Sequence, residues 1–190
     1  MPDPRVSKLA KVLINYSLKI QPGEQLVIQT TPLADELTLA VYEEAVKAGA
    51  HIMVLNQVPG TREIFFKNAS DEQLNFISPT QKYMLENTDA FLRIWADSNT
   101  RALSGIDPQR LAQFGRANAE MSKLMMQRSA SGELKWCLTV YPTNAMAQDA
   151  DMNLMDYTEF VYGAGMLNED NPTAFWEEEA ERQRKLINWM

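Results

Sequence analysis

The chain has 190 residues, of which 45% are hydrophobic and 23% charged, and 18 basic against 25 acidic residues give a formal net charge of −7. This size and composition suit one globular domain that buries a sizeable core. The acidic balance argues against a nucleic-acid-binding protein and against docking on an anionic membrane, because both need a basic surface.

The beginning of the sequence lacks the features of a secretory signal, in which a basic stretch precedes an apolar run and a small-residue cleavage site. No apolar run is long enough to span a bilayer. Cys137 is the single cysteine, so it has no partner for an internal disulfide. We therefore expect a cytoplasmic protein that binds neither nucleic acid nor membrane.

The first part of the chain predicts alternating helices and strands. Asp3, followed by a proline, is a typical start for a helix. Residues 25–30 and 51–56 are short apolar runs typical of buried strands, with a helix over residues 33–48 between them. Gly49 suits the left-handed end of that helix. Two strands joined by a helix of this length pair in parallel.

The middle of the chain continues the alternation. Residues 59–88 predict short helices, residues 89–96 a third strand, and residues 107–128 one helix that starts with an aspartate and a proline. Residues 134–141 predict a fourth strand with alternating side chains. From residue 153 onwards, the pattern is helical.

These elements predict an α/β fold with a mostly parallel twisted sheet of about four or five strands, helices on both faces, and a helical C-terminal segment. We expect an α/β domain over residues 1–150 and a helical segment over residues 151–190. The last helix ends on Trp189 and Met190 with no glycine or proline to stop it. This ending predicts a truncated chain whose segment 151–190 leads towards a missing C-terminal domain.

A search for catalytic chemistry finds no convincing constellation. The only histidine, His51, begins a strand predicted to be buried, which favours a structural role, and no cluster has the spacing of metal ligands. Asp149 and Asp151 are better explained as caps of the next helix, and Cys137 as a buried, inert thiol. Signatures of a serine nucleophile or of phosphate binding are absent. We therefore predict no catalytic and no metal-binding residue.

In a parallel sheet, ligands gather at the loops beyond the carboxyl ends of the strands. These loops are predicted at residues 30–32, 97–101 and 142–144, and all three are rich in polar side chains. Their composition is compatible with a binding site and equally with ordinary helix caps.

Five stretches of the sequence carry a family resemblance. They are DPRVSKLAKVLINYSLKIQPGEQLVIQ, AVYEEAVKAGAH, NTRALSGIDP, GELKWCLTVYPTNAMAQDADMN and FVYGAGMLNEDNPTAFW. Together, in this order and spacing, they resemble the N-terminal half of the thermostable-type metallo-aminopeptidases (aminopeptidase T and aminopeptidase S family). The resemblance covers essentially the whole chain.

The resemblance implies a parent enzyme that releases N-terminal amino acids from a peptide substrate. Its site would hold two divalent cations (zinc, cobalt or magnesium), which activate water and polarise the scissile carbonyl. In the family, the ligands lie in the second half, and one is the glutamate of a Met-Pro-Thr-Gly-Glu segment that this sequence lacks. No family ligand therefore carries over, no cation is expected on this chain, and the missing C-terminal domain would be the catalytic one.

By the same resemblance, the chain would be architectural and inactive alone, helping to form a homodimer and to wall the substrate cavity. Asn99, Arg101 and Thr143 are the residues predicted to face that cavity.

Two other readings stay open from the residues alone. One is a stand-alone α/β module that binds a small ligand. The other is a dimerisation module without catalysis, which would associate through the face of Phe175, Trp176, Trp189 and Met190.

Overall fold

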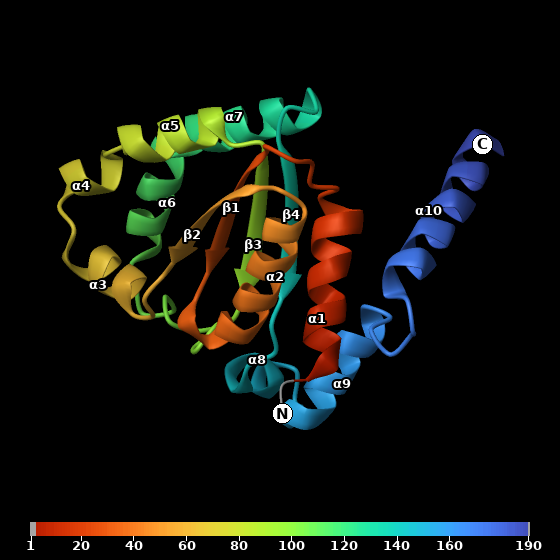
Figure 1. The fold of residues 1–190 in the computed structure, drawn as a ribbon. Helices are drawn as coiled ribbons and strands as arrows, with labels where there is room; N and C mark the ends of the chain where they lie inside the picture. The colour runs from red at the N-terminus through yellow and green to blue at the C-terminus, as the bar shows by residue number, and fades with distance from the viewer. Residues whose placement is uncertain (1–2, 190) are drawn as a thin grey trace.

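The computed structural model describes residues 3–189 as a four-stranded, all-parallel sheet with helices around it and a helical C-terminal segment (Figure 1). The strands are β1 (Gln25–Thr30), β2 (His51–Asn56), β3 (Ala90–Trp95) and β4 (Lys135–Val140), in the order β2-β1-β3-β4. The predicted α/β class is confirmed, with the lower of the two expected strand numbers in the described residues.

Helices precede the first strand, connect the strands and follow the last one. They are α1 (Pro4–Lys11), η1 (Val12–Ser17), η2 (Pro32–Ala34), α2 (Asp35–Lys47), α3 (Thr61–Asn68), α4 (Asp71–Asn75), α5 (Pro79–Asn87), α6 (Pro108–Ala117), α7 (Ala119–Ala130), α8 (Asn144–Asp149), α9 (Leu154–Ala164) and α10 (Pro172–Trp189). The predicted caps at Asp3 and Asp107 are confirmed, because their carboxylates accept the backbone N–H of Arg5 (2.9 Å) and Gln109 (2.8 Å).

The helix predicted over residues 107–128 is two helices. Asn118 separates α6 from α7, with φ −89° and ψ 7°. Its side-chain amide donates to the carbonyl of Phe114 at 2.9 Å. An asparagine that bonds to nearby backbone offers the chain an alternative to helix propagation, so the single-helix expectation is wrong at this residue.

The main core lies between one face of the sheet and the helices α1, η1 and α2 (Figure 1). The two central strands contribute Leu26, Ile28, Leu92 and Ile94, each at most 2% exposed. The register pairs Leu26 with Ala90 and Ile28 with Leu92, so these side chains share one face. Each such aliphatic side chain contributes about 1.5–3 kcal/mol on burial.

A smaller, separate core joins α3, α4 and α6. Its buried members are Phe66, Ala69, Leu74 and Ile106. Phe66 packs edge-to-face against Phe114 at a centroid distance of 5.3 Å. These helices therefore form a unit of their own beside the sheet.

The edge strands are more exposed than the sequence predicts. His51 and Met53 on β2 are exposed, and Trp136 and Leu138 on β4 are 48% and 39% exposed. The expectation of a buried strand at residues 51–56 is wrong because β2 has a neighbour on one side only. Cys137 points to the main core and is half-buried, and burial raises the pKa of its thiol, as expected for an unreactive cysteine.

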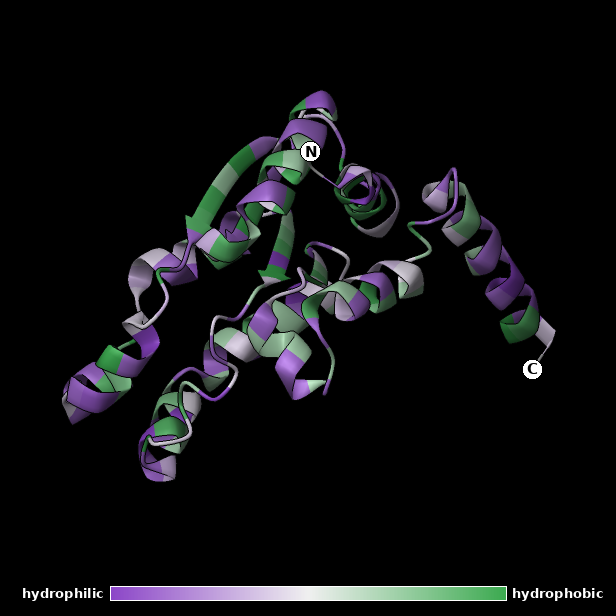
Figure 2. Cartoon of the chain, turned by 90° about the horizontal axis from the view of Figure 1, so that it is seen from below, coloured by the Kyte–Doolittle hydropathy of each residue, from purple (hydrophilic) through white to green (hydrophobic). Residues whose placement is uncertain are grey.

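The C-terminal segment packs into the main core at its start, and its last helix, α10, leads away from that core (Figure 1). Tyr162 and Leu167 are part of the main core, and the indole N–H of Trp176 donates to Gly165 at 3.1 Å. Trp176 is thus turned inward, contrary to the expected outward face. α10 projects away from the rest of the structure (Figures 1 and 2), and Trp189 is 85% exposed. Met190 lies outside the described residues, and the division at residue 150 stays a prediction.

None of the helices described here is long and apolar enough to cross a membrane.

Candidate functional site

A crevice of about 270 Å³ lies at the carboxyl ends of the central strands β1 and β3. Its walls come from residues 29–31, 57–60, 62–63, 93–100 and 102–103. The chain leaves β1 towards β2 on one side and leaves β3 towards β4 on the other. Such a reversal of strand order is where open parallel sheets bind ligands, because the two departing connections leave a gap between them.

Arg93 is one of four charged residues that line the crevice, with Arg62, Glu63 and Asp97. It lies on β3, on the face opposite Leu92 and the main core, and is half-buried. Its guanidinium carbon lies 5.8 Å from the ring centroid of Trp95, which is 42% exposed. Burial lowers the pKa of Arg93, the neighbouring charge of Arg62 lowers it further, and Asp97 opposes both. The site therefore holds two positive charges that destabilise one another.

Neither arginine has an acidic partner of its own. Across residues 3–189, no Asp or Glu oxygen lies within 4.0 Å of the guanidinium nitrogens of Arg62 or Arg93. Arg5, Arg101 and Arg128, by contrast, each pair with an acidic side chain, at 2.7, 3.6 and 3.3 Å, while Arg110 donates to the backbone carbonyls of Phe66 and Ala69. A half-buried arginine without a partner is unfavourable unless a ligand supplies the anion.

The start of α3 lies in the same wall, and the N–H of its first residue, Thr61, donates to the carbonyl of Val58 at 3.3 Å. Gly60 precedes the helix with φ +89° and supplies no side-chain cap. The first-turn N–H groups of a helix have no intrahelical partner, and the helix dipole places partial positive charge there. Arg62 and Glu63 in this turn both line the crevice.

Threonines fix the backbone at this edge of the sheet. The hydroxyl of Thr31 donates to the carbonyl of Ala96 at 2.8 Å, and that of Thr143 donates to the carbonyl of Asp97 at 2.7 Å. These bonds tie the loop after β3 to both neighbouring strand ends. They hold in place Ala96 and Asp97, which line the crevice.

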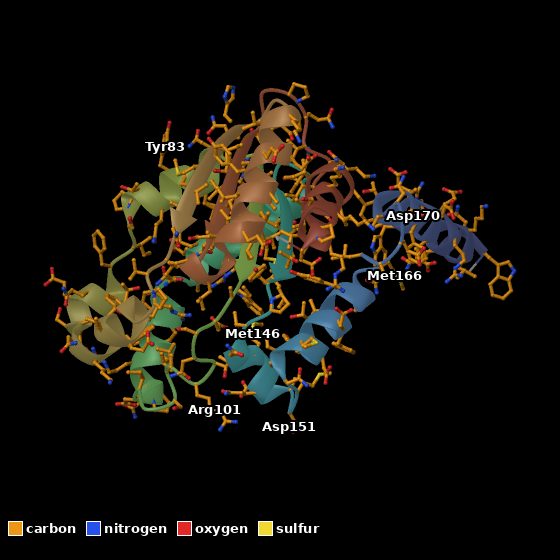
Figure 3. The ribbon with its side chains drawn as sticks, turned by 60° about the horizontal axis from the view of Figure 1, so that its bottom comes forward. Tyr83, Arg101, Met146, Asp151, Met166 and Asp170 are labelled. Carbon is orange, nitrogen blue, oxygen red and sulfur yellow. The ribbon has the colours of Figure 1, made fainter. Side chains whose placement is uncertain are left out.

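The structure separates the three residues predicted to face a cavity. Asn99 lines the crevice, and its side-chain oxygen accepts the N–H of Arg101 at 3.0 Å. Arg101 is 81% exposed and pairs with Asp149 on α8 at 3.6 Å; Figure 3 shows it beside that helix. Thr143 is 8% exposed and caps α8 through Met146 (3.3 Å). Only Asn99 lines this crevice, and a role at the cavity of a whole enzyme stays a prediction.

The sequence suggested that Asp149 and Asp151 cap the next helix, α9, and this expectation is wrong. Asn153 caps α9 instead, accepting the N–H of Asp156 at 3.0 Å. Asp149 is occupied by Arg101, and Asp151 has a positive φ of 53° in the turn after α8.

Sequence reasoning missed Arg62 and Arg93. One signal was available: Arg93 is the single charged residue in the otherwise apolar stretch AFLRIW of β3. The contribution of α3 depends on how the loop at residues 57–60 folds over the sheet edge, and local sequence patterns do not specify that.

Comparisons with known proteins identify the family. A family model described as thermophilic metalloprotease (M29) matches residues 2–190. The chain belongs to the M29 metalloprotease family. The predicted resemblance to thermostable-type aminopeptidases is thereby confirmed.

Relatives in this family are aminopeptidases. Aminopeptidase 2 of Geobacillus stearothermophilus is 24% identical over 207 residues, covering 99% of this chain and 48% of that protein. Aminopeptidase PepS of Streptococcus thermophilus is 23% identical over 192 residues, covering 93% of this chain and 46% of that protein. The chain thus spans about half the length of the curated relatives it matches.

The fold also has a solved counterpart. Wild-type AmpT from Thermus thermophilus superposes with a TM-score of 0.75 at 19% identity, covering 97% of this chain and 48% of that one. The α/β architecture is therefore shared with this structure.

The family implies divalent metal ions, and the residues described here do not fit them. Among residues 3–189, no group of three or more His, Cys, Asp or Glu side chains could hold a metal ion. His51, the only histidine in the sequence, is exposed on an edge strand. We therefore derive no catalytic step through a metal held by this chain.

Proposed function

We propose that this chain is the N-terminal α/β part of a metal-dependent aminopeptidase that releases N-terminal amino acids from peptides. The observation that carries the proposal is the family match over residues 2–190, at about half the length of the aminopeptidase relatives. Two divalent cations (zinc, cobalt or magnesium) would activate water and polarise the scissile carbonyl, bound by residues outside this chain.

In this proposal the chain has an architectural role. It forms one wall of the substrate cavity and part of the contact between two copies in a homodimer. Exposed aromatic residues support it, notably Trp136 on β4 and Trp189 on α10, at 48% and 85% exposure. Apolar side chains exposed in this way often mark surfaces that contact another domain or chain. With one cysteine and no internal disulfide, the protein suits the cytoplasm.

Sequencing the coding region beyond Met190 tests the proposal. It predicts an in-frame continuation about as long again, containing carboxylates and histidines with metal-ligand spacing, among them a Met-Pro-Thr-Gly-Glu segment. A stop codon directly after Met190 would contradict it and leave the isolated α/β module as the functional protein.

A second candidate function is a small-ligand-binding module. The crevice at the carboxyl ends of β1 and β3 favours it, because Arg93 is half-buried there without an acidic partner. Binding at the crevice and membership of a larger enzyme are compatible, so the two candidates require separate tests.

A further inference from the structure

We propose that the crevice at the carboxyl ends of β1 and β3 binds a free α-amino acid, with Arg93 and Arg62 holding the carboxylate and Asp97 facing the ammonium group. The inference goes beyond the proposed function and does not depend on it. Its test measures binding alone, without metal and without catalysis.

Positive groups without an acidic partner define the carboxylate end of the site. Arg93 and Arg62 line the crevice together with the first turn of α3, which has no side-chain cap. A guanidinium binds a carboxylate through two parallel hydrogen bonds, and a helix N-terminus adds backbone donors and partial positive charge. The lowered pKa of Arg93 agrees with this geometry, because a bound anion would relieve both its burial and its repulsion by Arg62.

Acidic residues in the same walls define the ammonium end of the site. Asp97 and Glu63 line the crevice, so its charged side chains are two positive and two negative. A phosphate dianion would gain from the arginines and be repelled by both carboxylates. A zwitterion matches both signs, and Asp97 is the acid whose charge is felt at Arg93.

The size of the crevice limits the occupant. Its volume of about 270 Å³ lies just below the range of roughly 300–1,000 Å³ that holds drug-sized ligands. A single amino acid fits this space. Trp95, which lines the crevice and is 42% exposed, offers apolar ring surface to a side chain such as that of leucine.

Calorimetric titration of the 190-residue chain with four probes tests the inference. L-leucine carries both charges, L-leucinamide lacks the carboxylate, N-acetyl-L-leucine lacks the ammonium, and inorganic phosphate is a simple anion. The inference predicts saturable binding of L-leucine and affinity about tenfold lower for the two blocked compounds, as expected for the loss of a charge-assisted contact. Equal binding of L-leucinamide, tighter binding of phosphate, or no binding of L-leucine at millimolar concentration would each overturn it.

Single substitutions test which side chains contact the carboxylate and the ammonium group of the bound amino acid. Arg93→Met and Arg62→Gln should each weaken L-leucine binding by about tenfold. Arg62 is exposed, so its variant keeps the test valid if the Arg93 variant does not fold. Asp97→Asn should weaken L-leucine and leave N-acetyl-L-leucine unchanged. Arg101→Gln is the matched control, because Arg101 is exposed at the same sheet edge and does not line the crevice. An affinity unchanged in Arg93→Met and Arg62→Gln, or reduced as much in Arg101→Gln, would contradict the assignment.

Discussion

Arg5 on α1 and Glu159 on α9 form a two-point ion pair, in which Nη1 and Nη2 of the arginine each donate to one carboxylate oxygen at 2.8 Å. Arg5 also pairs with Asp3 at 2.7 Å and lies 5.0 Å from the ring centroid of Tyr162. It holds the pKa values of both carboxyl groups below their ordinary range. One side chain thus joins the start of the chain to the helical segment near its end.

Arg5→Met should destabilise the fold by about 1–2 kcal/mol, because the arginine is well covered and makes charge-assisted bonds to two partners. For a chain of this length, that corresponds to a melting temperature lower by about 2–8 °C. Thermal unfolding followed by circular dichroism measures it. Lys11→Met on the same helix is the control, and an equal loss there would show that the Arg5 contacts contribute nothing specific.

The same variant predicts a pH dependence. Asp3 and Glu159 have lowered pKa values in the folded chain, so their stabilisation is present above their unfolded values of about 4 and is lost as the pH falls through the folded values. The difference in melting temperature between the original chain and Arg5→Met should therefore shrink as the pH is lowered from 7 to about 3. A constant difference over this range would contradict the ion-pair explanation.

Tyr141 and Glu36 join the end of β4 to the start of α2. The tyrosine hydroxyl donates to Oε2 of Glu36 at 2.8 Å, while Oε1 of Glu36 is buried without a partner in the described residues. Tyr141→Phe should cost about 1–3 kcal/mol, because it leaves a carboxylate with no partner at all. Urea unfolding measures the loss, and Tyr83→Phe, at a residue that is 68% exposed, is the matched control. A loss no larger than that of the control would refute this role.

The pKa of Tyr141 also predicts how the stability of the fold changes at alkaline pH. Burial, and then the hydrogen bond to Glu36, raises the pKa of Tyr141 to about 12 from its ordinary 10. The contribution of a raised pKa is fully present below the unfolded value and is lost as the pH rises through the folded value. Stability should therefore fall between about pH 10 and 12, and fall less steeply in Tyr141→Phe. Identical slopes in the two proteins would contradict the assignment.

Gly23 and Gly49 have similar positive φ angles, but we predict that replacing each by alanine lowers the free energy of unfolding by different amounts. Gly49 has φ +84°, and a Cβ there would lie 3.1 Å from Cβ and 3.2 Å from Cα of Pro22. Gly23 has φ +87° with nothing within 4 Å of such an atom. Gly23→Ala should cost about 1–2 kcal/mol from backbone strain alone. Gly49→Ala should cost more in the same unfolding experiment, and equal losses would show that the Pro22 contact is accommodated freely.

Local signals predicted much of the fold from the sequence. The aspartate-proline starts at Asp3 and Asp107, the left-handed Gly49 and the apolar runs of the four strands all reflect interactions within a few residues. Such interactions are set mainly by neighbouring side chains, so they can be recognised in the sequence without knowledge of the strand order. The parallel pairing followed from the length of the connections.

What the sequence did not predict depends on strand order and on distant contacts. β2 reads as a buried strand because its residues are apolar, yet it lies at the sheet edge, where His51 and Met53 are exposed. The crevice brings Arg62 and Arg93 together from separate elements, and no spacing rule connects residues so placed. Thr143 follows β4, as predicted, but its hydroxyl is used in backbone hydrogen bonds: it donates to the carbonyl of Asp97 and accepts the N–H of Met146.

The most direct test of the proposed function is hydrolysis of leucyl p-nitroanilide by the 190-residue chain in the presence of zinc, cobalt or magnesium. We predict no turnover above the metal-only blank and no metal retained after dialysis, since the described residues offer no metal-binding cluster. Turnover that rises with chain concentration and disappears on chelation would contradict this account and place catalytic residues within the chain itself.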